Sequence, residues 1–181
     1  MAYVKVKDGV LEQYPYSKEM LIRDNPNVSF GYLSNEDLSF WGLYIVHPSP
    51  YTEFNRITHK LIELDPVYDG ENWIQQWSIE EVSAEEKSSN IISTKNLINK
   101  QAQDRLDSFA MSRGYDNIMS ACSYVNSTNI TFQSEAQKCI ELRDSMWNCL
   151  MNIFTSVDNN LRAMPININE IENELPVLAW D

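Results

Sequence analysis

Residues 105–118 read Arg-Leu-Asp-Ser-Phe-Ala-Met-Ser-Arg-Gly-Tyr-Asp-Asn-Ile, and this stretch decides the fold of the second half of the chain. Leu106 and Phe109 fall on one face of a helix. Gly114 is the residue type that most readily takes a positive φ just past a helix end. Asp116 then offers a side chain that can cap a following helix. The stretch predicts a helix, a turn at Gly114 and a second helix.

Helical patterns extend from this turn in both directions. Ser83 and Glu86 form a capping box that begins the helix leading into the turn, although its first third is polar. After the turn we expect a helix to about Tyr124 and then a long helix with apolar residues at three- and four-residue steps. Its expected core residues are Trp147, Leu150 and Phe154. The apolar tail at 177–180 is expected to dock on these helices.

The first half of the chain has shorter, β-like patterns. Residues 2–6 alternate as in a strand, and residues 43–46 form a second apolar run. Residues 60–82 resemble a hairpin around a turn at Asp69-Gly70. Pro66 predicts that the first arm lies at a sheet edge or contains a bulge. Short helices are expected after the capping residues Ser17 and Ser34.

These patterns predict an α+β fold in which a small N-terminal antiparallel β portion is followed by a C-terminal helical bundle. We expect a β-rich domain with short helices over residues 1–82. Residues 83–100 would be a connector or the start of a helix, and residues 101–181 a helical domain.

The composition excludes some classes of partner. Of 181 residues, 43% are hydrophobic and 11% aromatic, which is typical of a folded globular protein. The net charge is −12, and so acidic a surface repels the phosphates of DNA and RNA. No apolar stretch is long enough to span a membrane, and the first residues lack the apolar core of a signal peptide. We therefore expect no nucleic-acid and no membrane partner.

Residues that commonly carry chemistry are few and dispersed. His47 and His59 are the only histidines, and neither has a cysteine or carboxylate at the spacing of a metal site. Cys122, Cys139 and Cys149 lack Cys-x-x-Cys spacing and are expected to be reduced, mostly buried thiols. The chain has no glycine-rich phosphate loop and no nucleophile elbow. We expect no catalytic residue, no cofactor and no metal, and hence no enzyme.

The first half of the chain is rich in aromatic residues. Aromatic side chains fill the thin cores of small β domains, and they are also enriched in binding hot spots. We expect Trp41 and Trp77 to belong to the core. The candidate partner-binding residues are Tyr51, Phe54 and Trp73.

Several segments carry a family resemblance. In the second half they are the stretch 105–118, Ala121 with Tyr124, Arg143-Asp144 with Trp147, and Glu172-x-Glu-Leu-Pro-x-Leu-Ala-Trp180. In the first half they are Leu21-x-Arg-Asp-Asn-Pro-x-Val-Ser-Phe30, Trp41-Gly-Leu-Tyr44 and Trp73-x-Gln-x-Trp77. Together they resemble small proteins of tailed bacteriophages known as tail-fibre assembly or tail-fibre-associated proteins. The shared residues are turns, caps and core aromatics, so no catalytic or ligand residue is carried over.

The resemblance implies a function. This family is understood mainly as assembly factors that act with trimeric tail fibres, and some members remain bound in the virion. It implies a chaperone-like protein that binds a tail-fibre or baseplate component in the host cytoplasm, as a monomer or homo-oligomer, with or without retention in the virion tail. The alternative is a permanent structural subunit of the tail, such as an adaptor or fibre-attachment protein. Finding the chain in purified virions would separate the two.

Overall fold

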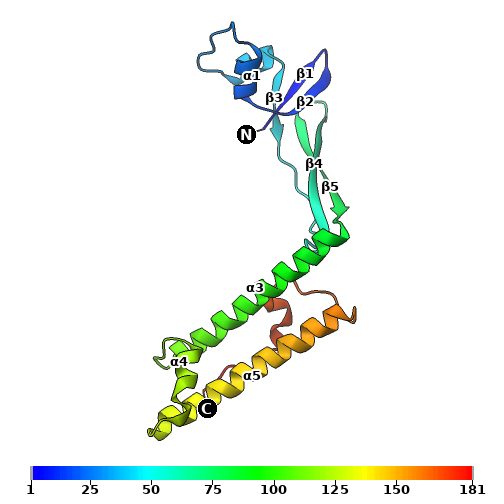
Figure 1. Ribbon diagram of the computed structural model, residues 1–181. Helices are drawn as coiled ribbons and strands as arrows, with labels where there is room; N and C mark the ends of the chain where they lie inside the picture. Colours follow the sequence, from blue (N-terminus) through cyan, green and yellow to red (C-terminus); the bar gives the residue numbers. More distant parts are fainter. Residues whose placement is uncertain (1, 181) are drawn as a thin grey trace. The chain divides into compact units, whose positions relative to one another are not determined.

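The computed structural model describes residues 2–180 and contains two compact units. One unit comprises Met1–Phe54 and His59–Glu81, and the other comprises Asn55–Thr58 and Val82–Asp181. The first unit holds all five strands and two short helices, whereas the second holds the long helices (Figure 1). The α+β class, with the sheet in the N-terminal half and the helices in the C-terminal half, is therefore confirmed.

The sheet has the strand order β2-β1-β3-β5-β4. Its strands are β1 (Tyr3–Lys7), β2 (Val10–Tyr16), β3 (Leu43–His47), β4 (His59–Tyr68) and β5 (Trp73–Glu81). The expected sheet was antiparallel throughout, but β3 and β5 pair in parallel while the other three pairings are antiparallel. The difference arises because β3 pairs with β5, the second strand of the β4–β5 hairpin, and not with β4, the first. The outer positions fall to β2 and β4, which are the two edge strands.

The first hairpin joins β1 to β2 through Asp8 and Gly9, which have φ of 51° and 80°. The sequence predicted β1 but gave no strand at β2. Its apolar residues do not alternate cleanly, and Pro15 lies within it. A proline is tolerated here because β2 is an edge strand and needs no donor on its outer side.

Two short helices lie between β2 and β3. Helix α1 (Lys18–Asp24) is capped by Ser17, and α2 (Asn35–Phe40) begins with the expected capping box of Ser34 and Asp37. They close a small core under the first strands. Its buried members are Tyr3, Tyr16, Leu21, Leu38 and Leu43, and Trp41 packs against it half-buried.

The helical unit contains α3 (Ala84–Met111), α4 (Ile118–Cys122), the 3₁₀ helix η1 (Ser123–Asn126), α5 (Ile130–Asp158) and the 3₁₀ helix η2 (Ile168–Glu174). Residues 83–100 form the N-cap and first part of α3, which runs without a break to Met111. Its start is fixed by the expected capping box of Ser83 and Glu86.

The short segment Asn55–Thr58 belongs to the helical unit, although it precedes β4 in the chain. Ile57 is only 5% exposed in the helical core. The side-chain amide of Asn90 donates to the carbonyl of Ile57 at 3.2 Å. The backbone N–H of Val82 donates to the carbonyl of Thr58 at 3.0 Å. The domain boundary expected from the sequence, at residue 82, would place this segment in the first unit, whereas the structure places it in the second.

The turn that follows α3 has the predicted conformation but a different cap. Gly114 has a φ of 87°, as expected for a glycine just past a helix end. The N-cap of α4 is Asn117 and not Asp116, because the side-chain amide oxygen of Asn117 accepts from the N–H of Ser120 at 2.9 Å. The Asp116 prediction was one residue early.

The core of the helical unit lies along α3 and α5. Ile98, Ala102, Leu106 and Phe109 of α3 are buried with Cys139, Met146, Leu150 and Ile153 of α5. Of the three core residues predicted on α5, Leu150 is 1% exposed and buried. Trp147 and Phe154 pack against this core but are only half-buried, so they are peripheral rather than central members of it.

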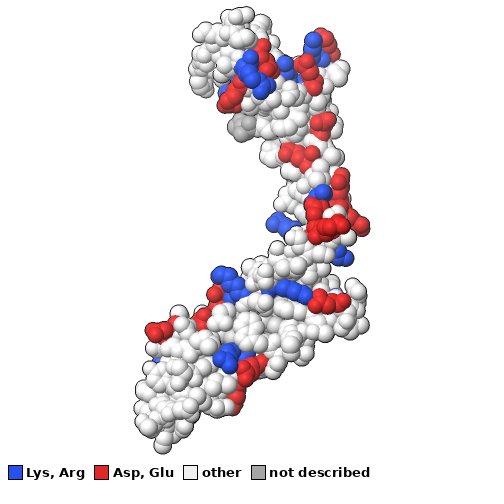
Figure 2. Space-filling model, viewed as in Figure 1, with Lys and Arg blue, Asp and Glu red and all other residues white. Residues whose placement is uncertain are grey.

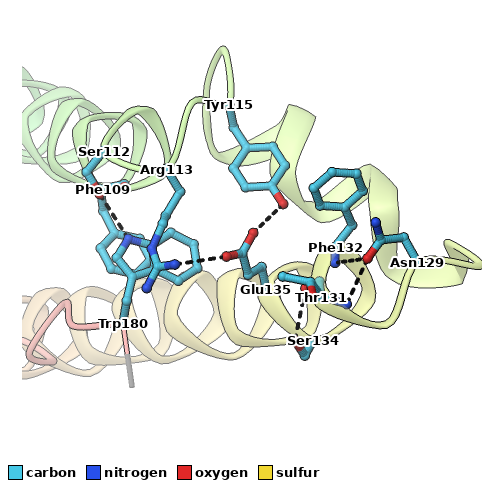
Figure 3. A network of polar contacts seen from close by, with 10 residues as sticks. All are labelled: Phe109, Ser112, Arg113, Tyr115, Asn129, Thr131, Phe132, Ser134, Glu135 and Trp180. Carbon is cyan, nitrogen blue, oxygen red and sulfur yellow. Dashed lines mark hydrogen bonds and ion pairs between the residues drawn. The ribbon is translucent and has the colours of Figure 1, made fainter.

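The tail after η2 docks on the helical unit, as predicted. Trp180 stacks on Phe109, and its indole N–H donates to the hydroxyl of Ser112 at 2.9 Å (Figure 3). The guanidinium of Arg113 lies 5.2 Å from the centroid of the Trp180 ring. The tail is thus anchored at the C-terminal end of α3.

Candidate functional site

The β4–β5 hairpin lacks a core of its own. It carries nine large apolar side chains, all within the described residues, and none of them is buried. They are Leu61, Ile62, Leu64, Val67, Tyr68, Trp73, Ile74, Trp77 and Ile79. A long two-stranded ribbon with half-exposed apolar residues on both sides is marginally stable in water. The hairpin is therefore the candidate interaction surface of the first unit.

One side of the hairpin is an aliphatic face made by Ile62, Leu64, Val67 and Ile74. Leu64 opposes Gln76 and Val67 opposes Ile74 across the ladder, which places both on the same side of the ribbon. Leu64 is 43% and Val67 55% exposed. The register shift between them contains the buried Pro66, so the strand is both an edge strand and bulged, as the proline predicted.

The opposite side carries the predicted partner-binding aromatics in two groups. Tyr51 is exposed, with ring centroids 6.3 Å from Phe54 and 5.8 Å from Trp77. Trp73 is half-buried at the start of β5 and packs against Tyr68 at 5.5 Å. Tyr51 and Phe54 are thus brought together, whereas Trp73 lies with another tyrosine next to the hairpin turn.

The segment that carries Tyr51 is held against β5 by hydrogen bonds. The indole N–H of Trp77 donates to the carbonyl of Ser49 at 3.1 Å, and the Ser49 hydroxyl donates to the carbonyl of Gln75 at 2.5 Å. Trp77 is half-buried and does not join the core cluster of the first unit, so its assignment to the core was wrong. Its position is explained by the segment it anchors.

A polar link ties the two hairpins of the first unit together. The hydroxyl of Tyr14 on β2 donates to the carboxylate of Glu63 on β4, which also accepts from the amide of Gln75 at 2.5 Å. Burial, and then the hydrogen bond to this carboxylate, raise the pKa of Tyr14 to about 12. The phenol therefore stays protonated near neutral pH and remains a donor, so it keeps this contact between β2 and β4.

The turn of the hairpin is closed by Asp69. Its carboxylate accepts from the N–H groups of Asn72 at 2.7 Å and Glu71 at 2.9 Å, and Gly70 has a φ of 107°. These backbone donors hold the pKa of Asp69 below its usual value. The turn predicted at Asp69-Gly70 is present, and its geometry sets the pairing of Tyr68 with Trp73.

Sequence reasoning missed the aliphatic face and the Tyr14–Glu63 link. Strict alternation along β4 places Leu64 and Val67 on opposite sides, and only the bulge brings them together. Tyr14 gave no signal because β2 was not recognised as a strand. The proline inside an apolar run was the one available sign that alternation would fail.

The histidines lie on strands of the first unit, and the cysteines lie on α4 and α5 of the second. His47 ends β3 and His59 begins β4. Burial raises the pKa of the buried thiols Cys122 and Cys139 and of the half-buried Cys149, whose thiol donates to the carbonyl of Glu174 at 3.2 Å. Within residues 2–180 no cluster of His, Cys, Asp or Glu is arranged to hold a metal ion, and no helix in that range is long and apolar enough to cross a membrane.

Comparison of the chain with protein-family models, with curated proteins and with solved structures found no match. The proposal below rests on the geometry of the β4–β5 hairpin and on the sequence resemblance described above.

Proposed function

We propose that this chain is a non-enzymatic, tail-fibre-associated assembly protein that binds a tail-fibre or baseplate component of a tailed bacteriophage. The observation that carries the binding role is the β4–β5 hairpin, which presents apolar residues on both sides without burying any of the large ones. The sequence resemblance supplies the class of partner. The resemblance also implies action in the host cytoplasm during assembly.

The edge of β4 supports a particular mode of binding. The strand is ten residues long and lies at the end of the sheet, so its outer backbone groups face away from β5. An extended segment of a β-rich fibre subunit adds to such an edge through main-chain hydrogen bonds. The aliphatic face then provides contacts for alternate side chains of the added strand, which gives specificity as well as affinity.

The chemistry of the surface supports a protein partner. The aliphatic face combines Leu64 and Val67 with half-buried Ile62 and Ile74, and the opposite side combines tyrosine, phenylalanine and tryptophan rings. Aromatic side chains bury a large area at little cost in conformational entropy, and they dominate protein interfaces. A chain that keeps a partner soluble during assembly needs such a surface.

The test uses the full chain, co-expressed with a tail-fibre protein of a tailed bacteriophage and followed by pull-down. The double variant Leu64→Lys, Val67→Lys is expected to weaken capture of the fibre by about tenfold or more, because it places charge in the centre of the contact. Val10→Lys is the matched control, since Val10 is 68% exposed on the other edge strand. Equal loss with the control variant, or full capture by the double variant, contradicts the proposal.

A second set of variants tests the aromatic side. Tyr51→Asp and Trp73→Asp are expected to reduce fibre binding while the melting temperature stays within a few degrees, because both side chains are exposed or half-buried. If the fibre is bound and the protein is also found in purified virions, the chain is a permanent tail subunit. If it is absent from virions, it acts only in assembly.

A further inference from the structure

One end of the helical unit is built from a stretch without charged residues, and the guanidinium of Arg143 borders it at 3.5 Å from the Sδ of Met119. The eighteen residues from Asn117 to Ser134 include no Lys, Arg, Asp or Glu, in a chain of which 22% is charged. They form α4, η1, the loop after it and the first turn of α5. Figure 2 shows white surface, neither acidic nor basic, over this end of the unit on the face in view. We call this surface the neutral tip.

Large apolar side chains are exposed on the neutral tip. Ile130 is 81%, Met119 60%, Tyr124 42% and Phe132 42% exposed. Tyr124 packs edge-on against Phe132, with ring centroids 5.6 Å apart, and against Tyr115 at 5.7 Å. These contacts hold the rings of the tip in place at the surface.

The backbone of the tip is held by two side-chain caps. Asn129 caps α5 and accepts from the N–H groups of Thr131 and Phe132, at 3.0 and 3.4 Å (Figure 3). Asn117 caps α4. A surface that is already ordered loses little conformational entropy when it is covered. Covering the tip with a partner would therefore cost little conformational entropy.

The nearest acid on α5 is satisfied within the unit. The carboxylate of Glu135 accepts from the Tyr115 hydroxyl at 2.7 Å and pairs with Arg113 at 3.3 Å (Figure 3). Its side chain is 14% exposed. Glu135 therefore contributes little free negative charge to the border of the neutral tip.

We propose that the neutral tip is where two copies of this chain associate. Two molecules that each carry a net charge of −12 repel one another, and the repulsion is smallest where both surfaces are uncharged. The polar groups of the tip are amides and hydroxyls, such as Asn126, Ser127 and Gln133. These groups both donate and accept hydrogen bonds, so they complement an identical surface, whereas carboxylates do not.

The charge distribution favours a second copy over a different protein. A basic partner is attracted to the acidic remainder of the molecule, and an uncharged surface gives it no electrostatic advantage. A two-fold arrangement places the same exposed side chains, Ile130 and Phe132, against each other across the axis. This inference is independent of the fibre-binding proposal, which concerns the other unit.

The test is analytical ultracentrifugation of the full chain over a range of concentrations. Wild type is expected to dimerise, and Ile130→Glu and Phe132→Glu are expected to raise the dissociation constant by about tenfold or more, because each adds two opposed acids to the contact. Ile92→Glu is the matched control, since Ile92 is an exposed isoleucine (60%) on α3 outside the tip. It is expected to leave the dissociation constant unchanged.

Salt dependence gives a second measurement. Association through the neutral tip is expected to strengthen as salt screens the repulsion between the two acidic copies, whereas an interface of ion pairs weakens. Ile130→Asn serves as a milder variant, with circular dichroism to check the fold. A wild-type chain that stays monomeric overturns the proposal. So does a dimer that survives Ile130→Glu, or a different protein captured at the tip of a monomeric chain.

Discussion

The indole ring of Trp180 stacks on the phenyl ring of Phe109, with ring centroids 4.1 Å apart and ring planes 12° apart. The stack joins the tail to the C-terminal end of α3, although the two residues are far apart in the sequence. Arg113 covers the indole and Ser112 accepts its N–H, so both polar and apolar parts of the ring have partners. A residue near the end of the chain therefore stabilises the helix that the turn at Gly114 terminates.

Replacing this tryptophan measures how much the docked tail contributes. Trp180→Ala is expected to lower the free energy of unfolding of the helical unit by about 2 kcal/mol, since the ring is stacked but only half-buried. Val177→Ala, in the same tail but 83% exposed, should change it by about 0.5 kcal/mol or less. Denaturant unfolding followed by circular dichroism gives both values. Equal stability of Trp180→Ala and wild type would show that the tail docks without stabilising the helices.

Substitutions at three glycines can separate two causes of lost stability, namely a positive φ and a steric collision of the added side chain. Gly42 has a φ of 74°, and a side-chain Cβ at this position would collide with the carbonyl oxygen of Val6 on the neighbouring strand. Gly114 has a φ of 87° with open space around it, and Gly31 shows neither feature. Gly114→Ala should therefore cost about 1–2 kcal/mol of stability, Gly42→Ala more than that, and Gly31→Ala almost nothing.

The glycine series is measured by denaturant unfolding, with hydrogen exchange to assign each loss to its unit. Gly42→Ala is expected to expose amides of β1 and β3, which the added methyl group pushes apart. Gly114→Ala should affect only the helical unit. If Gly42→Ala costs no more than Gly114→Ala, the close approach of Val6 to Gly42 is not a constraint on the fold.

The cap of α4 gives a prediction with a neighbouring control. Asn117→Ala should destabilise the helical unit by about 1 kcal/mol, because it leaves the N–H of Ser120 without its acceptor. Asp116→Ala should have a much smaller effect, since Asp116 is exposed and lies outside the cap. Thermal melting of the two variants decides between them. A larger loss of stability for Asp116→Ala than for Asn117→Ala would show that Asp116 is the cap, as expected from the sequence.

Much of the fold was predictable because local signals and tertiary structure agree. The capping boxes at Ser34 and Ser83, the turn at Asp69 and the long apolar stripe of α5 act within a few residues, and each is present. The α+β class follows from these elements. Local patterns carry this information because caps and turns are satisfied by their own neighbours in sequence.

The missed features depend on pairing between distant residues. The parallel pairing of β3 with β5 and the transfer of Asn55–Thr58 to the helical unit are choices between partners, which no local pattern encodes. The aliphatic face required the register on both sides of Pro66. Trp147 and Phe154 lie on the apolar side of α5 but are only half-buried, because periodicity gives the direction in which a side chain points and not how much of it neighbouring elements cover.

The cysteines give the last prediction, which concerns pH. Burial raises the pKa of Cys139 to about 11, from a usual value of 9.0, because the thiolate is unfavourable in the helical core. All three thiols should therefore react slowly with iodoacetamide near pH 8. Cys149, which is half-buried, should react first and Cys139, which is 0% exposed, last. Mass spectrometry of labelled peptides gives the order of reaction.

The same shift makes stability depend on pH in a defined window. Below about pH 9 the Cys139 thiol is protonated in both the folded and the unfolded chain, so its full contribution is present. As the pH rises from there towards about 11, the unfolded thiol ionises while the folded thiol does not, and stability is lost. Cys139→Ala lacks this group but keeps Tyr115, whose pKa is raised to about 12 by burial and its bond to Glu135. Wild type should therefore lose stability more steeply than Cys139→Ala across this window. Parallel slopes in denaturant unfolding at matched pH values would show that the thiol ionises as readily in the core as in the unfolded chain.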